Sequence, residues 1–77
     1  VKIPDGVTTI GNYAFEGCYS LKYVYCKATT PPALGGSSVF DRNASGRRII
    51  VPIGSGEAYK TAEYWSEYAN DIIEDEF

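Results

Sequence analysis

Histidine and methionine are absent from the 77 residues, and cysteine occurs only twice. Histidine is the usual general acid or base near neutral pH, so its absence removes the commonest proton-transfer group of an enzyme. The two cysteines, Cys18 and Cys26, lack the histidine or further cysteines that complete a tetrahedral metal site. No Asp or Glu pair stands in a recognisable pocket motif. We therefore predict a protein without metal, cofactor or catalytic activity.

Long apolar runs and concentrated basic charge are also missing. No run approaches the roughly 20 residues of a membrane span, so we expect no membrane insertion in this segment. The net charge is −3 and the pI is near 4.7, which argues against nucleic-acid binding because phosphate recognition needs a basic face. The one basic cluster, Arg42, Arg47 and Arg48, is interpreted as a solvated loop and strand edge.

The length and composition predict one small globular domain over residues 1–77. The chain has 44% hydrophobic residues and seven tyrosines. Its charge is unevenly distributed. Residues 57–77 contain seven acids and one lysine, whereas residues 1–56 contain six bases and three acids. Because the chain begins at Val1 within a predicted strand, we expect it to be a piece of a longer protein.

A short apolar pattern recurs at nearly fixed intervals. Ile3, Cys26 and Val51 lie in runs of β-branched or aromatic residues and are spaced by 23 and then 25 residues. Periods of this length are typical of repeat proteins. The pattern predicts three short parallel strands on one face, within residues 1–26 and 48–52.

The segments between these strands also correspond to each other. In the second copy of the pattern, Leu34 occupies the position equivalent to Ile10 of the first copy. Val39-Phe40 likewise occupies the position equivalent to Ala14-Phe15. We expect one continuous core to hold the larger apolar side chains of both copies and of the C-terminal segment. These are Phe15, Leu21, Phe40 and Trp65.

The two copies differ in their loops. In the first, Asn12 is predicted to cap a single helical turn over residues 13–16, which Gly17 ends. In the second, residues 28–38 contain two adjacent prolines and are predicted to form an enlarged loop.

The same register places both cysteines on the inward side, with Cys18 after the helical turn and Cys26 on a strand. Buried thiols behave as small hydrophobes. A disulfide closing the short loop between them stays open as an alternative, because the cysteine count is even.

Residues 53–77 are predicted to form a lid over the last repeat. Ser55 is a candidate N-cap, and apolar residues follow at helical spacing. The predicted stripe consists of Ala58, Ala62, Trp65, Ala69 and Ile72. Trp65 is expected to anchor the lid in the core, and stacking on a sugar ring is the less favoured alternative. Ile72-Ile73 is expected to add a closing strand or helix end, and residues 74–76 a solvated tail.

Two segments together resemble the BspA-type leucine-rich repeat and its C-terminal cap. The repeat-like segment is Ile3-Pro4-Asp5-Gly6-Val7-Thr8-Thr9-Ile10-Gly11-Asn12-Tyr13-Ala14-Phe15-Glu16-Gly17-Cys18-Tyr19-Ser20-Leu21. The cap-like segment is Val51-Pro52-Ile53-Gly54-Ser55, followed by Ala58-Tyr59-Lys60 and Trp65. The chain departs from the family pattern in its stretched second repeat and at Tyr64, where such caps tend to have Gly before the Trp.

The resemblance implies an α/β fold, a leucine-rich-repeat solenoid fragment with short parallel strands, one-turn helices and a C-terminal helical cap. Residues 1–27 would form a regular repeat, residues 28–52 an enlarged repeat and residues 53–77 the cap. Members of the family are secreted or surface proteins of gut and oral bacteria and of some protists, and some are adhesins for host proteins. The resemblance therefore implies an extracellular or cell-surface module that binds a protein partner, such as a host extracellular protein. It carries over no universal functional residues.

Strand alternation predicts which residues face the partner. Lys2, Tyr25 and Ile50 fall in one outward column, and Tyr23 and Arg48 fall in the next. Tyrosine and arginine are enriched among binding hot spots, so these five residues form the predicted binding ribbon. Tyrosines that serve only strand packing are the open alternative. A carbohydrate-binding module and a purely structural end cap of a longer array are the alternative functions.

The amino-terminal end is predicted to self-associate. Within residues 1–15, the first strand would be an edge, and Val7, Ile10 and Phe15 would lack a preceding repeat to cover them. Because open edges and apolar faces recruit other chains, we expect end-to-end association through this face at high concentration.

Overall fold

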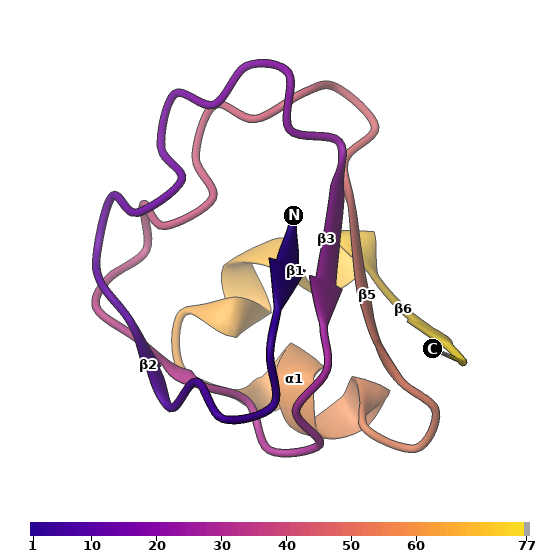
Figure 1. The fold of residues 1–77 in the computed structure, drawn as a ribbon. Helices are drawn as coiled ribbons and strands as arrows, with labels where there is room; N and C mark the ends of the chain where they lie inside the picture. Colours follow the sequence, from indigo (N-terminus) through magenta and orange to yellow (C-terminus); the bar gives the residue numbers. More distant parts are fainter. Residues whose placement is uncertain (77) are drawn as a thin grey trace.

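The structure, a computed structural model, describes residues 1–76 and forms a small α/β fold of parallel strands and two short helices (Figure 1). Phe77, the last residue of the predicted lid, lies outside the described residues. In chain order the elements are β1 (Lys2–Ile3), β2 (Thr9–Ile10), β3 (Tyr23–Cys26), β4 (Ala33–Leu34), β5 (Arg48–Pro52), α1 (Gly56–Thr61), the 3-10 helix η1 (Trp65–Asp71) and β6 (Ile72–Asp75).

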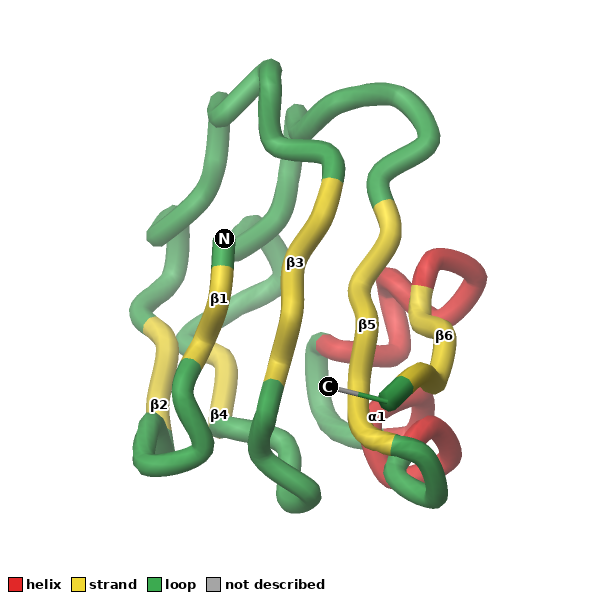
Figure 2. The backbone as a smooth tube through the Cα atoms, turned by 45° about the vertical axis from the view of Figure 1, so that its right-hand side comes forward, coloured by secondary structure: helices red, strands yellow, loops and turns green. Residues whose placement is uncertain are grey.

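Four strands form one sheet in the order β1-β3-β5-β6, and each neighbouring pair is parallel (Figure 2). The register aligns Ile3 with Cys26 and Tyr25 with Ile50. Inward-facing β-branched residues such as Val24 are buried, as period-2 alternation requires. The prediction of three parallel strands is confirmed, and Ile72-Ile73 begins the closing strand β6.

A second, two-stranded parallel ladder joins β2 and β4 and pairs Ile10 with Leu34. Beyond it, the loops of the two copies run side by side. The amide of Phe15 donates to the carbonyl of Val39 at 3.0 Å, and the Phe15 and Phe40 rings stack with centroids 5.5 Å apart. The predicted correspondence of Leu34 with Ile10, and of Val39-Phe40 with Ala14-Phe15, is therefore confirmed.

The predicted helical turn over residues 13–16 is wrong, because the segment forms successive β-turns instead. Tyr13 has φ of 67°, so a left-handed residue stands at the start of the predicted right-handed turn. Gly17, with φ of 76°, does end the segment as predicted. Asn12 does accept from the Tyr13 amide, at 3.1 Å, but the same oxygen also accepts from the amide of Ser38 at 3.2 Å. Asn12 thus ties the first copy to the second.

The enlarged loop needs two glycines where it passes Asn12. A Cβ on Gly35 would lie 2.5 Å from the backbone nitrogen of Asn12, and a Cβ on Gly36 would lie 2.4 Å from its side-chain nitrogen. Only glycine permits such an approach without displacing one of the two chains.

The core lies between the sheet, the β2-β4 ladder and the helices. Trp65, Tyr59 and Phe40 are its largest fully buried side chains. Phe15 and Leu21 pack against it but are only partly buried. The predicted core is therefore confirmed, and its centre lies closer to the lid than to the first copy.

The lid is helical as predicted, but its helical segment is interrupted. Tyr64 has φ of 67°, and this left-handed residue separates α1 from η1. A left-handed φ is uncommon at a residue other than glycine, so this position marks a sharp break in the chain direction. Since the helix breaks, the stripe is not continuous: Trp65 and Ile72 are buried, but Ala58 is exposed and Tyr59 points inward in its place.

The cap of α1 also differs from expectation. Ser55 precedes α1, but its side chain makes no capping hydrogen bond. The amide of Gly56 instead donates to the carboxylate of Glu74 on β6, at 2.7 Å. Residues 74 and 75 therefore belong to a strand rather than to the solvated tail that was predicted.

Cys18 is exposed, which contradicts the predicted inward position, whereas Cys26 is buried as expected. Both thiols are free, so the disulfide alternative is not realised. Cys18 lies among successive turns, where its amide donates to the carbonyl of Phe15 at 3.3 Å and its carbonyl accepts from the amide of Leu21 at 3.0 Å.

Candidate binding face

The outward face of the four-stranded sheet brings all five predicted binding residues together. The register places Lys2 beside Tyr25, and Tyr25 beside Ile50. Tyr23 pairs with Arg48 in the adjacent column. We call this surface, formed by Lys2, Tyr23, Tyr25, Arg48 and Ile50, the outward ribbon.

Ile50 is the exception to the predicted exposure. Only 6% of its surface is accessible, although it faces outward. Pairing with β6 adds Ile73 to the same column, so Ile50 is flanked by Tyr25 on one side and Ile73 on the other. Ile73 is 43% exposed and takes the place of Ile50 as the exposed apolar group. Sequence reasoning missed it because the fourth strand was only one of two alternatives for residues 72–73.

Aromatic and cationic groups meet along β3. The rings of Tyr23 and Tyr25 stack with centroids 6.5 Å apart and an interplanar angle of 28°. The ammonium of Lys22 lies 6.0 Å from the centre of the Tyr23 ring, at the limit of a cation–π contact. Tyr23 is 48% exposed and Tyr25 is half-buried, so Tyr23 is the more accessible member of the pair.

Arg48 is held at the end of the outward ribbon. Its Nη1 donates to the carbonyls of Gly46 and Arg47, at 3.2 Å and 3.1 Å. The residue as a whole remains exposed, and both of these bonds use the same nitrogen. A fixed guanidinium with free donors is suited to a carboxylate on a partner, because less side-chain entropy is lost on binding.

A depression opens at the other end of the ribbon. It is lined by Lys2, Tyr25, Lys27 and Glu76. Lys27 lies two residues beyond Tyr25 and therefore faces outward as well. Three cations, Lys2, Lys27 and Arg48, and one acid, Glu76, thus surround two tyrosines on this face of the sheet.

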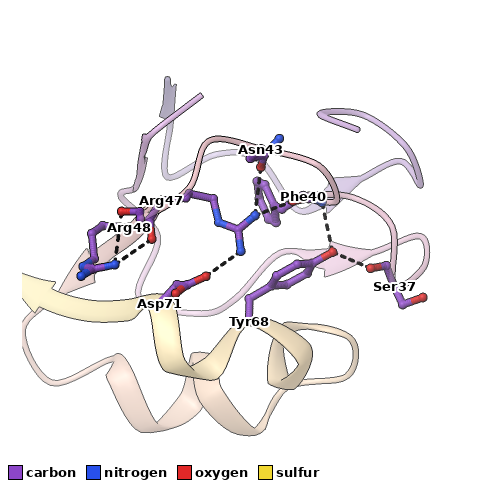
Figure 3. A network of polar contacts seen from close by, with 8 residues as sticks. Ser37, Phe40, Asn43, Arg47, Arg48, Tyr68 and Asp71 are labelled. Carbon is purple, nitrogen blue, oxygen red and sulfur yellow. Dashed lines mark hydrogen bonds and ion pairs between the residues drawn. The ribbon is translucent and has the colours of Figure 1, made fainter. Parts of the chain in front are cut away.

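A second polar group, which the sequence did not indicate, lies behind the sheet (Figure 3). Arg47 was predicted to be solvated, but its side chain is 11% exposed and forms an ion pair of 2.7 Å with Asp71. It also donates to the carbonyl of Phe40 and to Asn43, and its guanidinium lies 4.9 Å from the Tyr68 ring centre. No periodicity signals a partner 24 residues away, so only folding reveals it. The group joins the loop that contains Phe40 and Asn43 to the 3-10 helix of the lid.

The nucleophilic and aromatic groups of the core are unsuited to chemistry or recognition. Burial raises the pKa of the Cys26 thiol to about 12, so it stays protonated at neutral pH. Trp65 is fully buried and donates from Nε1 to the carbonyl of Pro32 at 2.8 Å. Stacking of Trp65 on a sugar is therefore ruled out by its position. Among the described residues, no cluster of three or more His, Cys, Asp or Glu side chains could hold a metal ion.

Over residues 1–76, no helix has the length and apolar character to cross a membrane. Comparison with known proteins found no matching family model, no matching curated protein and no matching solved structure.

Proposed function

We propose that this chain is a non-catalytic protein-binding module of the BspA-type leucine-rich-repeat kind. Two contacts support the repeat architecture, because each joins equivalent positions of successive copies: the pairing of Ile10 with Leu34 and the stacking of Phe15 on Phe40. In this proposal residues 1–27 and 28–52 are successive coils of a solenoid, and residues 53–77 are its cap.

The observation that carries the binding function is the composition of the outward ribbon. Its two tyrosines and Arg48 are the residue types most enriched at binding hot spots. They lie on the outside of the sheet, where the core does not use them. Strand packing alone does not require Arg48 to be fixed by two carbonyls beside an exposed Tyr23.

The partner we propose is an extracellular protein, and the setting is the cell surface or the extracellular medium. This part of the proposal rests on the resemblance to surface proteins and adhesins. The ribbon adds a chemical expectation, because three cations beside two tyrosines favour an acidic patch on the partner.

The test is a binding assay of the chain on a panel of immobilised extracellular matrix proteins, with a glycan array run in parallel. The triple variant Tyr23→Ala, Tyr25→Ala, Arg48→Ala should lose at least about tenfold in affinity for a matrix protein that the parent binds. Circular dichroism checks that it stays folded.

A matched control removes the same chemistry elsewhere. Tyr13, Tyr19 and Arg42 are exposed on loops away from the sheet. Their triple alanine variant should bind like the parent. Equal losses in both variants would reject the outward ribbon as the site, and a specific glycan signal without protein binding would favour the carbohydrate-binding alternative.

A further inference from the structure

The depression at one end of the outward ribbon holds charges of both signs. Its volume is about 370 Å³, and its lining consists of Lys2, Tyr25, Lys27 and Glu76. Hollows of roughly 300 Å³ or more are large enough to bury a small ligand. The depression is therefore the part of the ribbon where a side chain of a partner can be enclosed rather than only touched.

Two lysines flank one tyrosine in this depression. Lys2 pairs with Tyr25 across β1 and β3, and Lys27 follows Tyr25 by two residues on the same face. Within residues 1–76, neither lysine side chain has a hydrogen-bond or ion-pair partner. Two unpaired ammonium groups beside an aromatic wall suit an acidic side chain, because the carboxylate meets the charges and its methylenes meet the ring.

Among the lining residues, Glu76 supplies a carboxylate to the same space. The two acids before it are bound elsewhere. Glu74 accepts from the Gly56 amide at 2.7 Å, and Asp75 accepts from the amide of Glu76 at 2.8 Å. Within residues 1–76, no ion pair joins Glu76 to either lysine. Its carboxylate therefore shares the depression with two ammonium groups without neutralising either of them by direct contact.

We propose that the depression receives a carboxylate from an acidic segment of the protein partner, and that Glu76 is a built-in competitor for the same two lysines. The inference rests on the proposed function, because it takes the outward ribbon to bind a protein. Two ammonium groups outweigh one carboxylate, so an acidic side chain is attracted overall. Glu76 repels it at the same time, and a partner must offer enough negative charge to overcome this repulsion. The site thereby rejects weakly acidic surfaces.

The expected effects are modest, because the charged residues of the depression are exposed. Lys2, Lys27 and Glu76 all lie at the surface. Interactions between exposed charges are weakened by water and screened by salt. We therefore expect the loss of one charge to change the dissociation constant by about two- to fivefold at low salt, and by less at high salt.

The experiment titrates the chain with a hexaglutamate peptide whose termini are blocked, and the hexaglutamine counterpart is the control. Two-dimensional amide NMR at about 0.05 M and about 0.5 M NaCl measures the dissociation constant and maps the site. We expect the amides of Tyr25 and Lys27 to shift with hexaglutamate alone, and binding to weaken at the higher salt. Equal shifts with both peptides, or no binding of hexaglutamate at either salt, would overturn the proposal.

Removal of the competitor should tighten binding. Glu76→Gln should bind hexaglutamate about threefold more tightly than the parent. Glu63→Gln changes the net charge equally at an exposed residue outside the depression, and it should bind like the parent. An equal gain in both variants would mean that only the net charge matters, and would overturn the role of Glu76.

Removal of the lysines should weaken binding. The double variant K2Q/K27Q should bind hexaglutamate about fivefold more weakly than the parent. Arg42→Gln combined with Lys60→Gln removes the same charge from exposed residues outside the depression, and it should bind like the parent. Circular dichroism checks the fold of each variant. Equal losses in the two double variants would overturn the site.

A combined variant separates competition from repulsion at a distance. If Glu76 competes for the two lysines, Glu76→Gln should not change the affinity for hexaglutamate once K2Q/K27Q is present, because nothing is left to compete for. A threefold gain that persists in the triple variant would show that Glu76 acts independently of the lysines, and would reject competition.

Failure of this inference differs from failure of the proposed function. A matrix protein that loses affinity for the triple alanine variant of Tyr23, Tyr25 and Arg48, but binds the parent and Glu76→Gln equally, would keep the function and overturn the inference. Hexaglutamate binding at the depression without any matrix-protein partner would support the carboxylate site and reject the proposed function. A heparin hexasaccharide that binds where hexaglutamate does not would overturn the acidic protein segment in favour of a sulfated glycan.

Discussion

The guanidinium of Arg47 lies 2.7 Å from the carboxylate of Asp71, and it joins the last loop of the second copy to the 3-10 helix of the lid. The same side chain donates to the carbonyl of Phe40 and covers the ring of Tyr68. The hydroxyl of Tyr68 in turn donates to the carbonyl of Ser37 and accepts from the amide of Phe40 (Figure 3). Polar contacts therefore fasten the lid where apolar packing alone would leave loop carbonyls unpaired.

Replacing Arg47 should destabilise the fold. Arg47→Ala leaves Asp71 and the Phe40 carbonyl without their donor, and we expect a loss of about 3 kcal/mol in the free energy of unfolding. Arg42 is an exposed arginine five residues earlier in the chain. Its replacement by alanine should change the free energy of unfolding by less than about 0.5 kcal/mol. Urea unfolding measures both. Equal effects would mean that the ion pair contributes nothing specific.

The two stacked phenylalanines should differ in their importance. Phe40 is fully buried and touches Trp65 and Tyr68, whereas Phe15 is only partly buried. We expect Phe40→Ala to cost about 4 kcal/mol and Phe15→Ala about 2 kcal/mol. Thermal unfolding of the two variants checks the order. A larger loss at Phe15 would place the centre of the core in the first copy.

Glu74 should make stability depend on pH in the acid range. Its pKa lies below the ordinary value of 4.5, chiefly because the Gly56 amide donates to its carboxylate, with a second contribution from Gly54. A depressed folded pKa stabilises the fold above the unfolded pKa, and this stabilisation is lost as pH falls through the folded pKa.

We therefore expect the melting temperature of the parent to fall from about pH 5 to about pH 3, and to fall less in Glu74→Gln. Glu63→Gln removes an exposed carboxylate in the link between the two helices and should follow the parent. If the Glu74→Gln curve parallels the parent over this range, the contact with Gly56 does not couple to folding.

The two cysteines should react differently. Cys18 is exposed, whereas Cys26 is buried and its pKa is raised to about 12. A thiol reagent should therefore label Cys18 alone in the native chain, and both residues after unfolding in urea. Mass spectrometry of the labelled peptides identifies the site. Rapid native labelling of Cys26 would mean that the lid opens readily.

The sequence by itself determined three strands, β1, β3 and β5, and their alignment, but not β2 or β4. Alternating apolar residues at intervals of 23 and 25 residues predict which side of each strand is buried, and a slip by one residue would reverse every side chain. The columns Lys2-Tyr25-Ile50 and Tyr23-Arg48 could therefore be predicted from the sequence alone. Burial of Trp65 was predicted from helical spacing, and it is confirmed although the predicted stripe is not continuous.

Tertiary structure alone decided the remaining features. Left-handed backbone at Tyr13 and Tyr64 replaced a predicted helical turn and split a predicted helix, and propensity gives no sign of it at a tyrosine. Ile50, which is only 6% exposed, pairs with Ile73 of β6, a strand that follows the two lid helices in the chain. The contacts of Arg47 with Asp71 and of Glu74 with Gly56 join residues 24 and 18 positions apart. Such pairs follow from where the chain returns in space, which local pattern does not encode.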